Sequence, residues 1–166
     1  SHNPRPQPAS GPVGERLATE YPEALVASLR APHPSSFGIG YQWFSVEEID
    51  DARRVERVAA AMPQFAAAIR HWQRATGLGP AATVLVGFSQ GASMVLEAAN
   101  QAGDDVLAGR VVALAGRYAR LPLTNPGGTT LFLVHGKTDA VITYGFTVER
   151  GRHLVGVGVE VVGDVV

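Results

Sequence analysis

The chain has 166 residues and no cysteine, which excludes disulfides, thiolate nucleophiles and cysteine-based zinc sites. No apolar run approaches the ~20 residues that a membrane-spanning helix needs. The formal net charge is −1, and no basic stripe of the kind that follows a phosphate backbone is present. These absences predict a protein without a membrane span or a nucleic-acid partner. The missing cysteine fits a reducing compartment, so we expect a cytoplasmic location.

Hydrophobic residues make up 46% of the chain and aromatic residues 7%, which is typical of a globular protein. A chain of this length can bury a substantial core. The sequence contains no internal repeat. We therefore expect residues 1–166 to form a single domain.

Apolar patterns predict that short strands alternate with helices. Strands are predicted at 25–29, 83–88, 110–115, 130–134 and 157–162. Helices are predicted at 13–21, 45–77, 90–101 and 144–155. Apolar strands separated by helices indicate an α/β fold, with a mostly parallel sheet and helices on both faces.

Two local signals define the long second helix. Ser45 and Glu48 match a capping box, which would begin the helix there. Pro63 is expected to kink or break it, because proline removes a hydrogen bond and its ring clashes with the preceding turn, unless Pro63 starts the first turn of a new helix. Gly77 and Gly79 are expected to end it.

A G-x-S-x-G pattern runs from Gly87 to Gly91, between an apolar strand and an amphipathic helix. This context predicts a nucleophile elbow, in which Ser89 lies on a sharp turn. We expect side chains at either glycine to clash with the strand or the helix. The backbone N–H of Gln90 would then help to bind an oxyanion at the helix N-terminus. An ordinary strand–turn–helix with a solvent-facing serine is the alternative.

A serine nucleophile needs a base, and the base needs an acid to orient it. In this kind of fold the order along the chain is serine, acid and histidine. Asp139 lies just after an apolar strand that ends at His135, where open parallel sheets place their chemistry. A turn or cap role is the alternative for Asp139.

The base is harder to place among the five histidines. His153 alone follows the acid by a useful distance, but it falls on a predicted helix, where a surface or packing role is favoured. His33 lies in an aromatic loop. Completion of an unusual triad by His153 or His33 stays open.

Four segments together resemble the phospholipase/carboxylesterase family of α/β-hydrolases, which includes acyl-protein thioesterases: "QWFSVEEI", "GFSQG", "GRYARLP" and "HGKTDAVI". The similarity is greatest to the small bacterial esterases and runs from about Gly14 to Val166. The resemblance implies that Ser89 is the nucleophile, Asp139 the triad acid and Gln90 an oxyanion donor. It also implies that the loop around Trp43 lines the substrate pocket, with a core aromatic as the alternative.

Two features of that family are absent from the sequence. One is the H-G-x-G segment that supplies a second oxyanion donor. The other is the catalytic histidine, which we expect beyond Val166. We therefore expect a partial α/β-hydrolase domain, lacking the early strands and the C-terminal histidine loop. The predicted function is hydrolysis of carboxylic esters or thioesters through an acyl-enzyme, without metal or cofactor. A non-catalytic α/β-hydrolase-like binding protein, or an inactive fragment, is the alternative.

Overall fold

The computed structural model describes residues 11–139 and 144–165, and the chain divides between residues 32 and 33 into two compact units. The end of the "HGKTDAVI" segment lies outside the described residues. In the first unit, α1 spans Pro12–Glu20, close to its predicted position. The strand predicted at 25–29 does not form. A strand needs a neighbour for its backbone hydrogen bonds, and within the described residues this segment has no paired strand.

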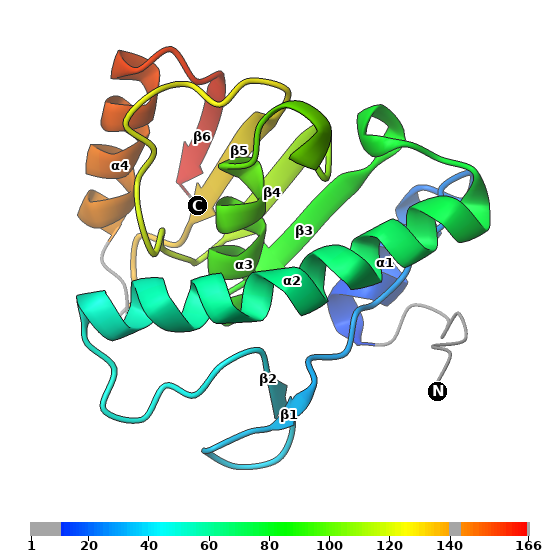
Figure 1. Cartoon of the computed structure of the whole chain (residues 1–166), viewed down its shortest axis with the longest axis horizontal. Coiled ribbons are helices and arrows are strands. Elements are labelled where there is room, and N and C mark those ends of the chain that lie inside the picture. The colour runs from blue at the N-terminus through cyan, green and yellow to red at the C-terminus, as the bar shows by residue number, and fades with distance from the viewer. Residues whose placement is uncertain (1–10, 140–143, 166) are drawn as a thin grey trace. The chain divides into compact units, whose positions relative to one another are not determined.

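The second unit contains a four-stranded parallel sheet, whose strands follow one another in chain order (Figure 1). The strands are β3 (Val84–Phe88), β4 (Arg110–Leu114), β5 (Thr130–His135) and β6 (Val161–Val165). Their carboxyl ends therefore meet at one edge of the sheet, which is the edge where the predicted nucleophile and acid follow β3 and β5.

One face of the sheet is buried beneath helices α2 (Asp51–Thr76), α3 (Gln90–Ala99) and α4 (Tyr144–Gly156). Leu85, Val111 and Leu131 lie side by side on this face and are at most 9% exposed. Helix α3 packs on β3 and β4, whereas α4 packs on β5 and β6. On the other face of β3, Val84 and Phe88 are exposed. Helical cover of that second face stays a prediction.

Helix α2 begins five residues later than the capping box predicted. Its N-cap is Asp50, whose carboxylate accepts a hydrogen bond from the Arg53 N–H at 2.7 Å. The Ser45 hydroxyl instead accepts from the Glu47 N–H within a turn, and Glu48 has a φ of 48°. Such a backbone cannot start a helix, so the capping-box prediction was wrong.

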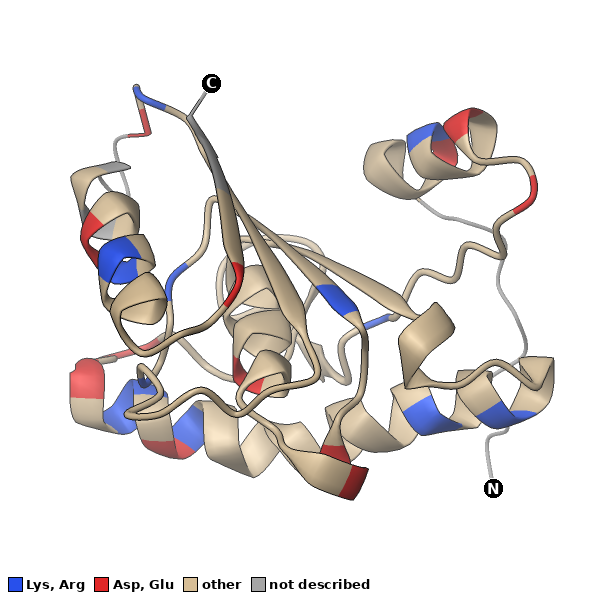
Figure 2. Cartoon of the chain, turned by 90° about the horizontal axis from the view of Figure 1, so that it is seen from above, with Lys and Arg blue, Asp and Glu red and all other residues tan. Residues whose placement is uncertain are grey.

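Pro63 does not break α2, since the helix is continuous over 26 residues. Of the two expected effects the break is wrong, and the kink stays a prediction. Pro63 is exposed, as is Ala59, whose carbonyl loses its partner in the helix and is accessible to water. The helix ends as predicted, with Gly77 in the left-handed conformation. Helix α2 has Asp51 in its first turn and Arg74 in its last turn, as the helix dipole favours, and Figure 2 shows basic residues near that last turn.

The remaining predicted elements form, with shifted ends. β6 starts at Val161 rather than 157, because the chain after α4 first turns back on the helix. The N–H groups of Val157 and Val159 donate to carbonyls of His153 and Leu154, and Gly158 has a φ of 84°. Two short strands, β1 (His33–Pro34) and β2 (Tyr41–Gln42), form an antiparallel pair in the predicted loop.

No helix among the described residues is long and apolar enough to cross a membrane. The expectation of a single domain over 1–166 stays a prediction, as does the cytoplasmic location.

Candidate active site

Ser89 connects β3 directly to α3 and has a backbone conformation that L-amino acids rarely adopt. Its φ is 52° and its ψ is −113°, and the residue is exposed. A conformation of this kind costs about 1–3 kcal/mol and persists only where the surroundings impose it. The serine hydroxyl is thus carried on a strained, accessible turn at the carboxyl edge of the sheet.

Hydrogen bonds on both sides of Ser89 impose this turn. The Ser89 N–H donates to the Leu114 carbonyl at 3.0 Å, which extends the pairing between β3 and β4 by one residue. The Ser89 carbonyl accepts from Ala92 at 3.1 Å and from Ser93 at 3.3 Å. The strand ladder and the first helical turn therefore both include the serine backbone.

The two glycines of the motif have different roles. A Cβ placed on Gly87 would lie 2.3 Å from the Gly91 carbonyl oxygen, so only glycine allows β3 and α3 to approach this closely. A Cβ on Gly91 would meet no atom within 4 Å beyond its chain neighbours and its own helix. The expected clash is confirmed at Gly87 and was wrong at Gly91.

Two residues after β4 were not identified from the sequence, and one of them, Gly116, packs against the nucleophile turn. Gly116 packs so closely on α3 that an added Cβ would lie 2.1 Å from Ala92 Cβ and 3.2 Å from the Ser89 carbonyl oxygen. Ala115 has a φ of 49°, and its N–H donates to the Val134 carbonyl. The glycine was a usable signal, but alanine gives no sequence indication of a left-handed backbone.

Gln90 follows the serine and occupies the first position of α3, where a backbone N–H has no acceptor within the helix. Its side-chain oxygen accepts a hydrogen bond from the Trp43 N–H at 2.7 Å. Its side-chain nitrogen donates to the Phe44 carbonyl at 2.8 Å. The Trp43 ring packs edge-to-face on Phe65 of α2, with ring centres 5.0 Å apart.

Asp139 lies in the turn after β5, and its N–H donates to the Gly136 carbonyl at 3.2 Å. Its carboxylate is 3.5 Å from Nε2 of His135, a ring that is 1% exposed. Nδ1 of the same ring is 3.0 Å from the Thr147 hydroxyl. Thr147 and His135 thus connect α4 to the predicted acid, a contact that the sequence analysis did not foresee.

Neither histidine considered as an alternative base contacts Ser89. The His153 ring is 2.9 Å from the Pro122 carbonyl and half-buried on α4, which is a packing role. His33 is exposed in β1. Within 11–139 and 144–165, no hydrogen bond joins a histidine to the Ser89 hydroxyl, and no group of three acidic or histidine residues is placed to hold a metal.

A surface pocket of about 330 Å³ lies between the start of α2, the segment after β4 and α4, and Ser89 does not line it. Arg117 pairs there with Asp51 at 2.6 Å. Burial, followed by the charge of Arg117, lowers the pKa of nearby Arg54. The Ser93 hydroxyl donates to the Arg117 carbonyl at 2.7 Å, which joins this segment to α3.

Together these features define a class of protein. A parallel sheet carries a strained serine between one strand and a helix, and an aspartate follows the next strand but one. This arrangement is that of the α/β-hydrolases.

A family profile described as phospholipase/carboxylesterase matches residues 24–159, and the chain belongs to this family. It is 44% identical over 158 residues to the esterase YpfH of Escherichia coli strain K12, covering 95% of this chain and 67% of that protein. The predictions of the family and of an esterase-type hydrolase are thereby confirmed.

Solved structures agree on the fold. Esterase PE8 is 26% identical, with a TM-score of 0.81 over 93% of this chain and 74% of that one. The carboxylesterase of Bacillus cereus is 18% identical, with a TM-score of 0.71 over 90% of this chain and 69% of that one. The predicted α/β-hydrolase fold is confirmed.

Proposed function

We propose that the protein is a serine hydrolase that cleaves carboxylic esters or thioesters through an acyl-enzyme at Ser89. The observation that carries this proposal is the exposed serine at φ 52° between β3 and α3. Strained residues of this kind cluster at active sites, where the surrounding structure maintains them. The esterase name of the 44% identical relative supports the same reaction class.

In the proposed reaction, the Ser89 hydroxyl oxygen attacks the carbonyl carbon while its proton passes to a base. The carbonyl electron pair moves onto oxygen, where the Gln90 N–H stabilises the charge. The alcohol or thiol leaves with the proton from the base. Water then attacks the acyl-enzyme by the same route and releases the acid. Asp139 orients the base, for which a histidine beyond Val166 stays our prediction.

The test is mass spectrometry of the full-length protein after exposure to a fluorophosphonate, which forms a bond to activated serines. We expect a single adduct on the peptide that contains Ser89, and none in Ser89→Ala. Ser93→Ala is the matched control, because it removes a hydroxyl one turn along the same helix that is 2% exposed. Its labelling should persist.

The alternative is a non-catalytic binding protein of the same fold. The observation that favours it is that no described histidine contacts Ser89. It predicts an unlabelled protein, or labelling that is unchanged in Ser89→Ala. Either result would reject the serine hydrolase proposal.

A further inference from the structure

We propose that the Gln90 side chain is a positioning residue that fixes the main chain of Trp43 and Phe44 beside the nucleophile turn, and thereby sets how tightly the ester is bound. The inference rests on the proposed function of Ser89. It concerns the Gln90 side chain, whereas the proposed oxyanion donor is the backbone N–H of the same residue.

The geometry of the amide is the first support. Its oxygen accepts from the Trp43 N–H at 2.7 Å, and its nitrogen donates to the Phe44 carbonyl at 2.8 Å. A reversed amide would place donor against donor and acceptor against acceptor, so this orientation is the one that satisfies both groups. The two bonds join residues that are more than 40 positions apart in the chain.

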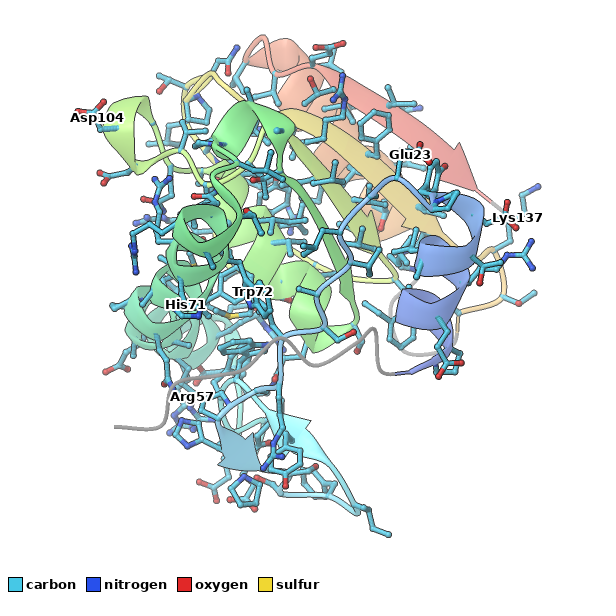
Figure 3. The ribbon with its side chains drawn as sticks, turned by 90° about the vertical axis from the view of Figure 1, so that its right-hand side faces the viewer. Glu23, Arg57, His71, Trp72, Asp104 and Lys137 are labelled. Carbon is cyan, nitrogen blue, oxygen red and sulfur yellow. The ribbon has the colours of Figure 1, made fainter. Side chains whose placement is uncertain are left out.

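The rest of this segment is held from another direction. Arg57 of α2, labelled in Figure 3, donates from one nitrogen to the carbonyls of Ser45 at 2.7 Å and Glu47 at 2.8 Å. These bonds fix the segment to α2 but not to α3. The Gln90 amide supplies the connection from this segment to the helix that begins at the nucleophile turn.

The nucleophile turn itself does not depend on the Gln90 side chain. The backbone of Ser89 is held by Leu114, Ala92 and Ser93. Loss of the amide should therefore release the Trp43 backbone without moving the serine. We predict that the loop around Trp43 lines the substrate pocket. We therefore expect substrate binding to weaken more than the chemical step, because displacing this loop changes contacts shared by the ground and transition states.

The first measurement needs no catalysis. Hydrogen exchange of the Trp43 amide, followed by NMR, should accelerate in Gln90→Leu, which has nearly the same shape but no hydrogen bonds. Two lost bonds of ordinary strength correspond to roughly tenfold or more in exchange rate. Gln101→Leu is the matched control, since that amide donates a single 3.4 Å hydrogen bond, to the Glu97 carbonyl of the preceding helix α3.

The second measurement is the kinetics of p-nitrophenyl butyrate hydrolysis. We expect KM to rise about tenfold in Gln90→Leu, with a smaller fall in kcat, and no change in Gln101→Leu. Gln90→Glu adds a rescue. Its carboxylate cannot donate to the Phe44 carbonyl, but its protonated form can both accept and donate. The KM ratio of Gln90→Glu to wild type should therefore fall towards one as pH decreases, while that of Gln90→Leu stays raised.

The outcomes separate the two proposals. Faster Trp43 exchange with raised KM and pH rescue supports the positioning role. Unchanged exchange in Gln90→Leu, or faster exchange with unchanged KM, overturns it while wild-type turnover shows that the proposed function stands. Wild-type protein without turnover or Ser89 labelling rejects the proposed function, and the positioning role with it.

Discussion

At the scale of single residues, the close approach of α3 to β3 depends on the absence of a side chain at Gly87. The space at Gly87 is closed by the main chain of Gly91, whose carbonyl oxygen cannot move without unwinding the first turn of α3. Gly91 itself faces open space. The two glycines of one short motif thus have opposite sensitivities to the same substitution.

We predict that Gly87→Ala lowers the free energy of unfolding by about 3 kcal/mol or more, because backbone must shift to admit the methyl group. Gly91→Ala should be neutral or stabilise by up to about 1 kcal/mol, since alanine is favoured over glycine within a helix. Urea denaturation followed by circular dichroism measures both. Equal losses in the two variants would contradict this account.

The sequence was sufficient to identify Gly87 and Ser89, because their motif has a local signature between a strand and a helix. It was not sufficient for Ala115 or for the side chain of Gln90. The φ of Ala115 and the amide contacts to Trp43 arise from tertiary neighbours, which no local pattern encodes.

At the scale of elements, the start of α2 shows how similar capping signals compete. Ser45 and Asp50 are both good N-cap residues, and Ser45 is also followed three positions later by a glutamate that could close a capping box. The Arg57 bonds to the carbonyls of Ser45 and Glu47 hold the earlier segment in a turn. The helix therefore begins at the second signal, which the sequence alone could not decide.

We expect Asp50→Ala to destabilise the protein by about 1 kcal/mol, because the Arg53 N–H loses its acceptor. Ser45→Ala should change stability by less than about 0.5 kcal/mol, since its hydroxyl makes only a 3.2 Å contact within a turn. Thermal unfolding of the two variants provides the comparison. A larger loss of stability in Ser45→Ala than in Asp50→Ala would instead support a capping box at Ser45 and Glu48.

The outcome of each strand prediction likewise depended on tertiary structure, here on whether a neighbouring strand was present to pair with the segment. The segments at β3, β4 and β5 formed as expected because each has a neighbour to pair with. Residues 25–29 have a similar apolar pattern and no such neighbour among the described residues. Apolar composition marks a potential strand, but pairing is what forms it.

At the scale of the whole molecule, the response of stability to pH contains a contribution from inside α3. Glu97 is 8% exposed, and burial raises its pKa, against the opposing effects of the Arg120 charge and a hydrogen bond from Asn100. The Glu97 carboxylate therefore binds a proton more readily in the folded state than in the unfolded state. Stability falls as pH rises through the interval between the two pKa values.

We predict that Glu97→Gln increases the free energy of unfolding at pH 7, because it removes the cost of burying a charge. The gain should shrink as the pH falls towards and below about 4, because glutamate then becomes protonated in the unfolded state as well as in the folded state. Glu149→Gln, at an exposed site on α4, is the control and should show little change. Urea denaturation between pH 4 and 7.5 tests this, and a gain that grows on acidification would contradict it.

The Gln90 amide contacts only main-chain atoms of the segment that it holds, so the link does not depend on which side chain stands at position 43. A substitution at that position removes the ring contact with Phe65 but leaves both groups that hydrogen-bond to Gln90 in place. Our prediction that Trp43 lines the substrate pocket therefore makes position 43 the first at which to diversify the enzyme towards new substrates.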